Sequence, residues 1–299
     1  MTTNTGASPA ADASLAQWLD WQLGLHRDEI QLGLERVARV ADRLGLRRQP
    51  PLTLTIGGTN GKGAATRLAA DLLQRAGHCV GQFTSPHLHD YAERIVVNGQ
   101  PVDPACIVEA FVAIESQRGD TPLTYFEFGT LAALWVFRAR GCTAQVLEVG
   151  LGGRLDAVNL LDADAALITS IGTDHGDWLG DSRQAIAVEK AGIFRPGKVA
   201  VCAEHAPPAE LAPHLAERDI RPLWIGQAFS VVSDGGPHWQ LQAADGPTLS
   251  LPQPPHLPGL HQLRNAAGVI TLLQHLRPSV VLPEGCLLYT SPSPRDLST

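Results

Sequence analysis

A glycine-rich segment with a single lysine is the part of the sequence best suited to chemistry. It reads Gly57-Gly58-Thr59-Asn60-Gly61-Lys62-Gly63 and lies between an apolar run and a helical pattern. Glycines let successive backbone N–H groups point at one spot, the helix N-terminus adds partial positive charge, and Lys62 can reach terminal phosphates. This segment predicts a nucleotide-phosphate site, with an ordinary glycine-rich turn as the alternative. Its glycine spacing is one residue shorter than in a Walker A motif, and Ala64 supplies no hydroxyl for magnesium.

Three further residues could take part in chemistry at such a site. Glu148 ends a predicted buried strand and precedes several glycines, which is where open α/β sheets place ligand-binding groups, and a carboxylate there favours a cation. His175 lies in the polar segment TSIGTDHGDWLG, and Lys190 lies near the end of a predicted helix. Each residue, taken alone, also has a structural interpretation. Glu148 could be a surface carboxylate at the end of a strand, His175 an ordinary loop histidine, and Lys190 a solvated lysine on a helix.

The elements that must position these residues follow an alternating pattern of strands and helices. Two amphipathic helices between Leu15 and Leu46 come first. Short apolar runs are expected to be strands at 52–56, 79–83, 145–149, 165–171 and 199–202, and longer helical patterns occupy 64–76, 104–117, 126–140 and 182–192. This order predicts an α/β fold with a doubly wound, mostly parallel sheet and helices on both faces.

The remainder of the chain follows a different pattern. Residues 222–256 alternate as short strands with turns at 234–236 and 245–246, which predicts a small antiparallel appendage. A proline-rich linker at about 251–259 then leads into a helix at 260–276. We expect residues 1–14 to be a disordered tail, residues 15–280 to form one domain, and residues 281–299, which are rich in Ser and Pro, to be a non-native tail.

Composition excludes several classes of protein. The 299 residues are 44% hydrophobic and carry a net charge of −7, so binding of nucleic acid along an extended basic face is not expected. No apolar run approaches the ~18 to 20 residues of a membrane span. The five cysteines form no C-x-x-C pair. We therefore expect a reduced, cytoplasmic protein without a membrane or nucleic-acid partner.

Several separated motifs resemble one family. The segment GTNGKG resembles the phosphate loop of the Mur ligase-like ATP-dependent amide ligases. The further motifs are LGLERV at 32–37, TSPHL at 84–88, LTYFEFGTLAAL at 123–134, LEVGLGGRLDAVN at 147–159, TSIGTDHGDWLG at 169–180 and EKAGIFRPG at 189–197. Together they look like the bacterial bifunctional dihydrofolate synthase/folylpolyglutamate synthases, from about Leu15 to Leu276.

This resemblance implies a fold like the Mur ligase central domain and a reaction in folate biosynthesis. ATP would phosphorylate a carboxylate of dihydropteroate or folate, and the amine of L-glutamate would attack the acyl phosphate. The family carries a second domain that supplies most of the glutamate site. No segment here matches it, so we expect a C-terminally truncated, weakly active monomer. A Mur-type ligase acting on UDP-muramyl substrates and a non-catalytic nucleotide-binding remnant are the alternatives.

The resemblance also implies roles for individual residues at the nucleotide end. The ATP contacts would be Thr59, Asn60, Gly61, Lys62 and Gly63, with Asn265 near the adenine. Magnesium, in one or two ions, would be held by Ser85, Glu148 and His175, and potassium is a further ion that the family allows. Lys62, His175 and Lys190 would be catalytic, and Lys190 would carry a carbamate.

A second group of residues would form the pterin or folate pocket. One segment is Thr124, Tyr125, Phe126 and Glu127, whose aromatic rings can stack on a flat heterocycle. The other is Leu155, Asp156 and Ala157, with Asp156 accepting hydrogen bonds from the pterin amino group. Aromatic residues at helical spacing are more often core, and an aspartate in a glycine-rich loop can simply cap its own turn.

Overall fold

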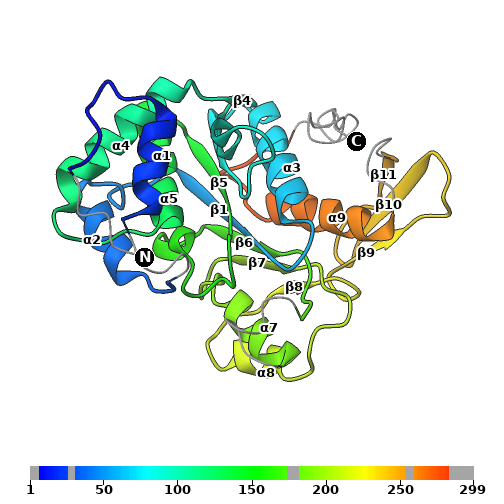
Figure 1. Ribbon diagram of the computed structural model, residues 1–299. Helices are drawn as coiled ribbons and strands as arrows, with labels where there is room; N and C mark the ends of the chain where they lie inside the picture. Colours follow the sequence, from blue (N-terminus) through cyan, green and yellow to red (C-terminus); the bar gives the residue numbers. More distant parts are fainter. Residues whose placement is uncertain (1–6, 26–30, 174–181, 254–258, 283–299) are drawn as a thin grey trace.

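The fold is built on an eight-stranded sheet with the order β4-β3-β2-β5-β1-β6-β7-β8 (Figure 1). A computed structural model describes residues 7–25, 31–173, 182–253 and 259–282. The strands are β1 (Leu52–Gly57), β2 (Val80–Phe83), β3 (Ile95–Val97), β4 (Gln100–Pro101), β5 (Ala144–Glu148), β6 (Ala165–Ile168), β7 (Val199–Cys202) and β8 (Leu223–Trp224). Neighbouring strands are parallel except at the two pairs that involve β3, β2–β3 and β3–β4, which are antiparallel.

Helices cover both faces of this sheet (Figure 1). Their bounds are α1 (Leu15–Leu23), α2 (Glu35–Arg43), α3 (Lys62–Arg75), α4 (Pro104–Arg118), α5 (Tyr125–Ala139), α7 (Arg183–Ala191), α8 (Leu211–Ala216) and α9 (Leu260–Gln274). Two 3₁₀ turns, η1 (Tyr91–Arg94) and η2 (Ala157–Leu160), complete the set. Among the residues described, no helix combines the length and apolar character that crossing a bilayer requires.

Two hydrophobic cores lie on opposite faces of the sheet. One contains α1, α2, α4, α5 and α7, with Trp18, Phe111 and Phe128 at most 1% exposed at its centre. The other packs α3 and α9 against the sheet and includes Phe229 and Trp239 of a smaller sheet. The parallel strands are buried on both faces, which is why they read as nearly continuous apolar runs in the sequence.

The smaller sheet is antiparallel and has the order β11-β10-β9. Its strands are β9 (Phe229–Val232), β10 (His238–Ala243) and β11 (Leu249–Pro252), and it lies beside α9 (Figure 1). Residues 251 and 252, placed in a linker by the sequence, belong to β11. Residues 254–258 of that linker lie outside the described residues.

The predicted α/β class and the mostly parallel sheet are confirmed, and one strand assignment is wrong. Residues 223–224 were expected in the antiparallel appendage, yet they pair parallel to β7 at the edge of the main sheet. A strand of two residues has no measurable periodicity, so its partner is decided by tertiary packing. The strands β3 and β4 and helix α8 were not expected from the sequence.

Candidate functional site

The glycine-rich segment forms the turn between β1 and α3, at the carboxyl end of the central strand. Gly61 has φ +79°, and a Cβ there would lie 2.1 Å from Nδ2 of Asn265. Gly58 has φ +142°, and a Cβ there would lie 2.0 Å from Oγ1 of Thr169. Both positions therefore require glycine for conformation and for space. Gly63 lies in the first turn of α3, whose N-terminus opens onto the loop.

Two hydroxyl residues after β6 hold the loop in place, and the sequence analysis gave them no role. The Thr169 hydroxyl donates to the Asn60 carbonyl oxygen at 2.7 Å. The backbone N–H of Thr59 donates to the Ser170 carbonyl at 2.9 Å, and that of Asn60 donates to Ser170 Oγ at 3.0 Å. The expected strand at 165–171 included both residues, whereas β6 ends at Ile168, so the apolar pattern alone did not reveal that they follow the strand, where such sheets place ligand-binding groups.

Two lysines from distant parts of the chain meet beneath the loop. Lys62 Nζ donates to the carbonyl oxygens of Gly58 and Thr59, each at 3.1 Å. Lys190, on α7, is 4% exposed, and its Nζ donates to the same Gly58 oxygen at 3.0 Å. The structure therefore brings together two of the three predicted catalytic residues. The third, His175, lies outside the described residues.

Two of the predicted metal ligands are also neighbours. Glu148 ends β5 and is 4% exposed, and its Oε2 accepts the backbone N–H of Ser85 at 3.0 Å. Ser85 follows β2, the strand beside β5. Within the described ranges no group of three or more His, Cys, Asp or Glu side chains could hold a metal ion by itself. The pair can supply a carboxylate and a hydroxyl, which are oxygen donors that suit Mg²⁺.

Aromatic rings line the region between η1 and the start of α5. Tyr125 meets Tyr91 edge to face with 5.7 Å between ring centroids, and the Arg94 guanidinium lies 5.4 Å from the Tyr91 ring and 5.6 Å from the Tyr125 ring. Burial raises the pKa of the Tyr125 hydroxyl, against the opposing charge of Arg94. Phe126 packs on Phe83 at 5.8 Å. Tyr125 and Phe126 are half-buried, so each packs against the core and also keeps part of its side chain exposed.

The other two predicted pterin contacts of this segment are engaged within the protein. Thr124 is the N-cap of α5, and its hydroxyl accepts the backbone N–H of Glu127 at 3.2 Å. The Glu127 carboxylate accepts the Thr124 N–H at 2.8 Å and forms an ion pair with Arg36 at 3.0 Å. This capping box fixes where α5 begins, and with it the direction of the aromatic side chains that follow.

The predicted residues Leu155, Asp156 and Ala157 follow the glycine-rich loop after β5. Leu155 is half-buried, and its carbonyl oxygen accepts the N–H of Gly33 at 3.2 Å. Asp156 is 3% exposed, and its carboxylate accepts the N–H groups of Leu151 and Val158 at 2.8 and 3.0 Å. Burial raises the pKa of Asp156 to about 6, although these hydrogen bonds and the charge of Lys62 favour the ionised form.

We expect this buried carboxyl to make stability fall as pH rises. The folded protein holds the Asp156 proton more tightly than the unfolded chain, whose carboxyl titrates near 3.8, so stability is lost between about pH 4 and 6. The free energy of unfolding, relative to Asp156→Asn, should fall by about 2 kcal/mol from pH 4 to pH 7. Denaturant unfolding of both proteins at several pH values measures this difference. A difference independent of pH would contradict the expectation.

A pocket of about 330 Å³ opens beside the phosphate loop, between the end of β7 and the start of α9. Asn60, Ser170, Glu204 and Asn265 are among its lining residues. Asn265 is 6% exposed, so the predicted adenine contact lies against both the loop and the pocket. Burial would raise the pKa of Glu204, but two backbone N–H donors and the charge of Arg183 lower it below its usual value.

Comparisons of the sequence and of the structure with known proteins find relatives of the same kind. The family model described as the Mur ligase middle domain matches residues 56–273. Dihydrofolate synthase/folylpolyglutamate synthase of Escherichia coli (strain K12) is 45% identical over 249 residues. The structure of E. coli FolC in complex with DHPP and ADP has 42% identity and a TM-score of 0.87. A bifunctional folylpolyglutamate synthase/dihydrofolate synthase with Mn, AMPPNP and L-glutamate bound has 41% identity and a TM-score of 0.86.

The matches cover nearly all of this chain but only part of the relatives. The E. coli sequence match covers 83% of this chain and 58% of that protein. The two structural matches cover 93% and 97% of this chain, and 66% and 69% of the chains compared. The chain thus spans about 58% of the length of the E. coli relative.

Proposed function

The chain belongs to the Mur ligase family through its middle domain, and we propose that it is the nucleotide- and pterin-binding part of a dihydrofolate synthase/folylpolyglutamate synthase. The whole enzyme would use ATP to activate a carboxylate of dihydropteroate or folate and would join it to L-glutamate. One observation carries the proposal. The phosphate loop with Lys62, the Glu148–Ser85 pair and the buried Lys190 lie at the carboxyl ends of the neighbouring strands β1, β2 and β5.

Different residues around the loop would bind different parts of ATP. Backbone N–H groups of Gly61, Lys62 and Gly63, together with the Lys62 side chain, would hold the phosphates, because a helix N-terminus and an ammonium group both favour anions there. Thr59 and Asn60 would fix the shape of the loop, since their own N–H groups donate to Ser170. Asn265 would contact the adenine from the pocket beside the loop. The relatives bound to ADP or to AMPPNP support this assignment.

The metal would sit at the Glu148–Ser85 pair, with His175 as a further ligand. A bound Mg²⁺ would neutralise the terminal phosphates and let an anionic carboxylate approach them. The donors present fit this ion, because a buried carboxylate and a hydroxyl are hard oxygen ligands. The relative with Mn and AMPPNP bound supports a divalent ion. A second Mg²⁺, a potassium ion, a monomeric state and a cytoplasmic location stay predictions.

Lys190 would act as a carbamate. Its Nζ and that of Lys62 both donate to one carbonyl oxygen, so the two amines lie within about 6 Å of each other, where like charges repel. The neutral amine of Lys190 would add CO₂ and release one proton. The product is an anion that removes this repulsion and supplies an oxygen ligand.

The pterin would lie between the aromatic side chains at the start of α5 and the loop that carries Asp156. Tyr125 and Phe126 offer ring faces or edges, while the capping box of Thr124 and Glu127 holds them in position. Asp156 offers a buried carboxylate as a second contact. The E. coli relative in complex with DHPP supports a pterin ligand.

Calorimetry on this chain tests the proposal. We expect Mg·AMPPNP and dihydropteroate to bind, and the AMPPNP affinity to fall about tenfold or more when Mg²⁺ is removed. Glu148→Gln should lose most of this Mg²⁺ dependence, whereas Glu109→Gln, on the exposed side of α4, should keep it. Binding of a UDP-muramyl substrate in place of dihydropteroate would reject the folate assignment. Absence of any heat with Mg·AMPPNP would reject nucleotide binding altogether.

A further inference from the structure

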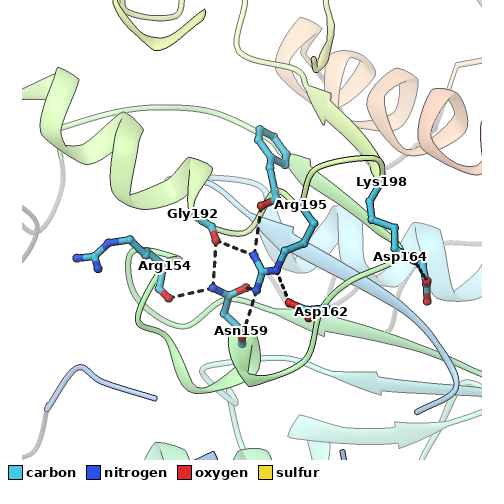
Figure 2. Close-up of polar contacts among 8 residues, drawn as sticks. Arg154, Asn159, Asp162, Asp164, Gly192, Arg195 and Lys198 are labelled. Carbon is cyan, nitrogen blue, oxygen red and sulfur yellow. Dashed lines mark hydrogen bonds and ion pairs between the residues drawn. The ribbon is translucent and has the colours of Figure 1, made fainter. Parts of the chain in front are cut away.

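The side chain of Asn159 joins two segments that the proposed function places at different ligands. It lies in η2 and is 4% exposed. Its Nδ2 donates to the carbonyl oxygens of Arg154 and Gly192, at 2.9 and 3.2 Å, and its Oδ1 accepts Nη2 of Arg195 at 3.0 Å (Figure 2). One buried amide thus links the glycine-rich loop after β5 to the turn that ends α7.

Arg195 completes this link from the far side of the turn. Its Nη1 donates to the carbonyl oxygens of Gly192 and Phe194, at 3.0 and 3.3 Å, and its Nε forms an ion pair with Asp162 (Figure 2). The guanidinium therefore holds the end of α7 and the acceptor oxygen of Asn159 at the same time. Charge-assisted hydrogen bonds of this kind are stronger than those between neutral groups.

The two segments are also in direct backbone contact. A Cβ at Gly153 would lie 2.8 Å from the carbonyl oxygens of both Glu189 and Lys190. A Cβ at Gly192 would lie 2.3 Å from Cβ of Arg154. In addition, the Arg154 N–H donates to the Glu189 carbonyl at 2.8 Å. A shift of the loop along α7 would break these contacts, so the position of one segment depends on that of the other.

Each segment carries a residue of a different proposed subsite. Asp156 lies on the pterin side, and its carbonyl oxygen accepts the backbone N–H of Asn159 at 2.9 Å. Lys190 lies on the phosphate side, two residues before Gly192, and its Nζ donates to the Gly58 carbonyl oxygen at 3.0 Å. We propose that Asn159 is a positioning residue that couples the two subsites, so that a ligand at one changes the affinity of the other. This inference rests on the proposed function, because that function assigns the ligands.

The test measures coupling rather than activity. The Kd of Mg·AMPPNP for this chain is determined by calorimetry with and without saturating dihydropteroate, and the ratio of the two values is the coupling factor. We expect a factor of about 5 or more in the unmodified chain, in the range found for coupled sites. Asn159→Asp keeps the acceptor for Arg195 but puts an oxygen opposite the two carbonyls, and should bring the factor close to 1 while nucleotide still binds.

Two further variants make the result decisive. Lys198→Ala removes a neighbouring ion pair, Lys198 to Asp164 at 2.8 Å, and leaves the side chains of Asn159 and Arg195 and the backbone N–H of residue 198, which donates to the Arg195 carbonyl, in place. It should keep the unmodified factor (Figure 2). Arg195→Gln loosens the link without changing Asn159, and should lower the factor even if Asn159→Asp does not fold. Unchanged coupling in both link variants, or a factor of 1 in the unmodified chain, overturns the inference. If the unmodified chain binds neither ligand, the proposed function itself fails.

Discussion

Replacing Lys62 with alanine is expected to weaken binding of Mg·AMPPNP about 100-fold, which corresponds to about 2.7 kcal/mol. The lysine belongs to the loop itself, and its Nζ lies 3.1 Å from two loop carbonyl oxygens. Ammonium groups bind phosphate through charge-assisted hydrogen bonds, which makes their removal costly. Calorimetric titration of the variant with Mg·AMPPNP measures the change.

The same helix offers a matched control. Arg67 lies one turn further along α3 and pairs with Asp71 at 3.0 Å. Arg67→Ala removes one positive charge from that helix without touching the loop, so nucleotide affinity should change less than about twofold, because exposed pairs contribute little and distant charges are screened. An equal loss in both variants would mean that general charge, rather than the placement of Lys62, governs binding.

Supplying ¹³C-bicarbonate is expected to produce one carbamate resonance in the ¹³C spectrum of the chain, and Lys190→Ala should abolish it. The variant should also require about 10- to 100-fold more Mg²⁺ for AMPPNP binding, the loss found when a group supporting a metal site is removed. Formate or acetate should restore part of the affinity by supplying the missing carboxylate.

Lys198→Ala is the control for this experiment, because Lys198 is an exposed lysine at the start of β7 and should leave the resonance in place. Full Mg·AMPPNP affinity in a chain whose Lys190 is unmodified would contradict the carbamate. Loss of nucleotide binding without any change in Mg²⁺ requirement would contradict the proposed position of Lys190 near the metal.

Strand and helix periodicity was enough to predict the class of fold and most of its elements. The hairpin of β3 and β4 was missed even though its turn has a recognisable sequence, Asn98-Gly99. Both residues have positive φ, +49° and +77°, as a two-residue hairpin turn requires. Strands of two or three residues are too short for an alternating pattern to be seen, so only the turn could have revealed them.

Some parts of the site depend on residues close together in the sequence, and others depend on contacts between distant segments. The phosphate loop could be predicted because its glycines and Lys62 are consecutive. The approach of Lys190 to Gly58 joins residues 132 positions apart, and it depends on how α7 packs beneath the sheet edge. Residue types alone favoured a solvated lysine, and only the resemblance to a family placed this side chain at the site.

The hydrogen bonds of the two lysines to the Gly58 carbonyl also bear on how nucleotide affinity should respond to salt. Lys62 donates to carbonyl oxygens of the loop itself, so a phosphate bound there would compete with protein oxygens as well as with solvent and mobile ions. The favourable electrostatic free energy of phosphate binding is then partly offset, because the lysines lose hydrogen bonds to the loop. The ionic-strength dependence of binding should accordingly be shallower than a count of the positive charges would suggest.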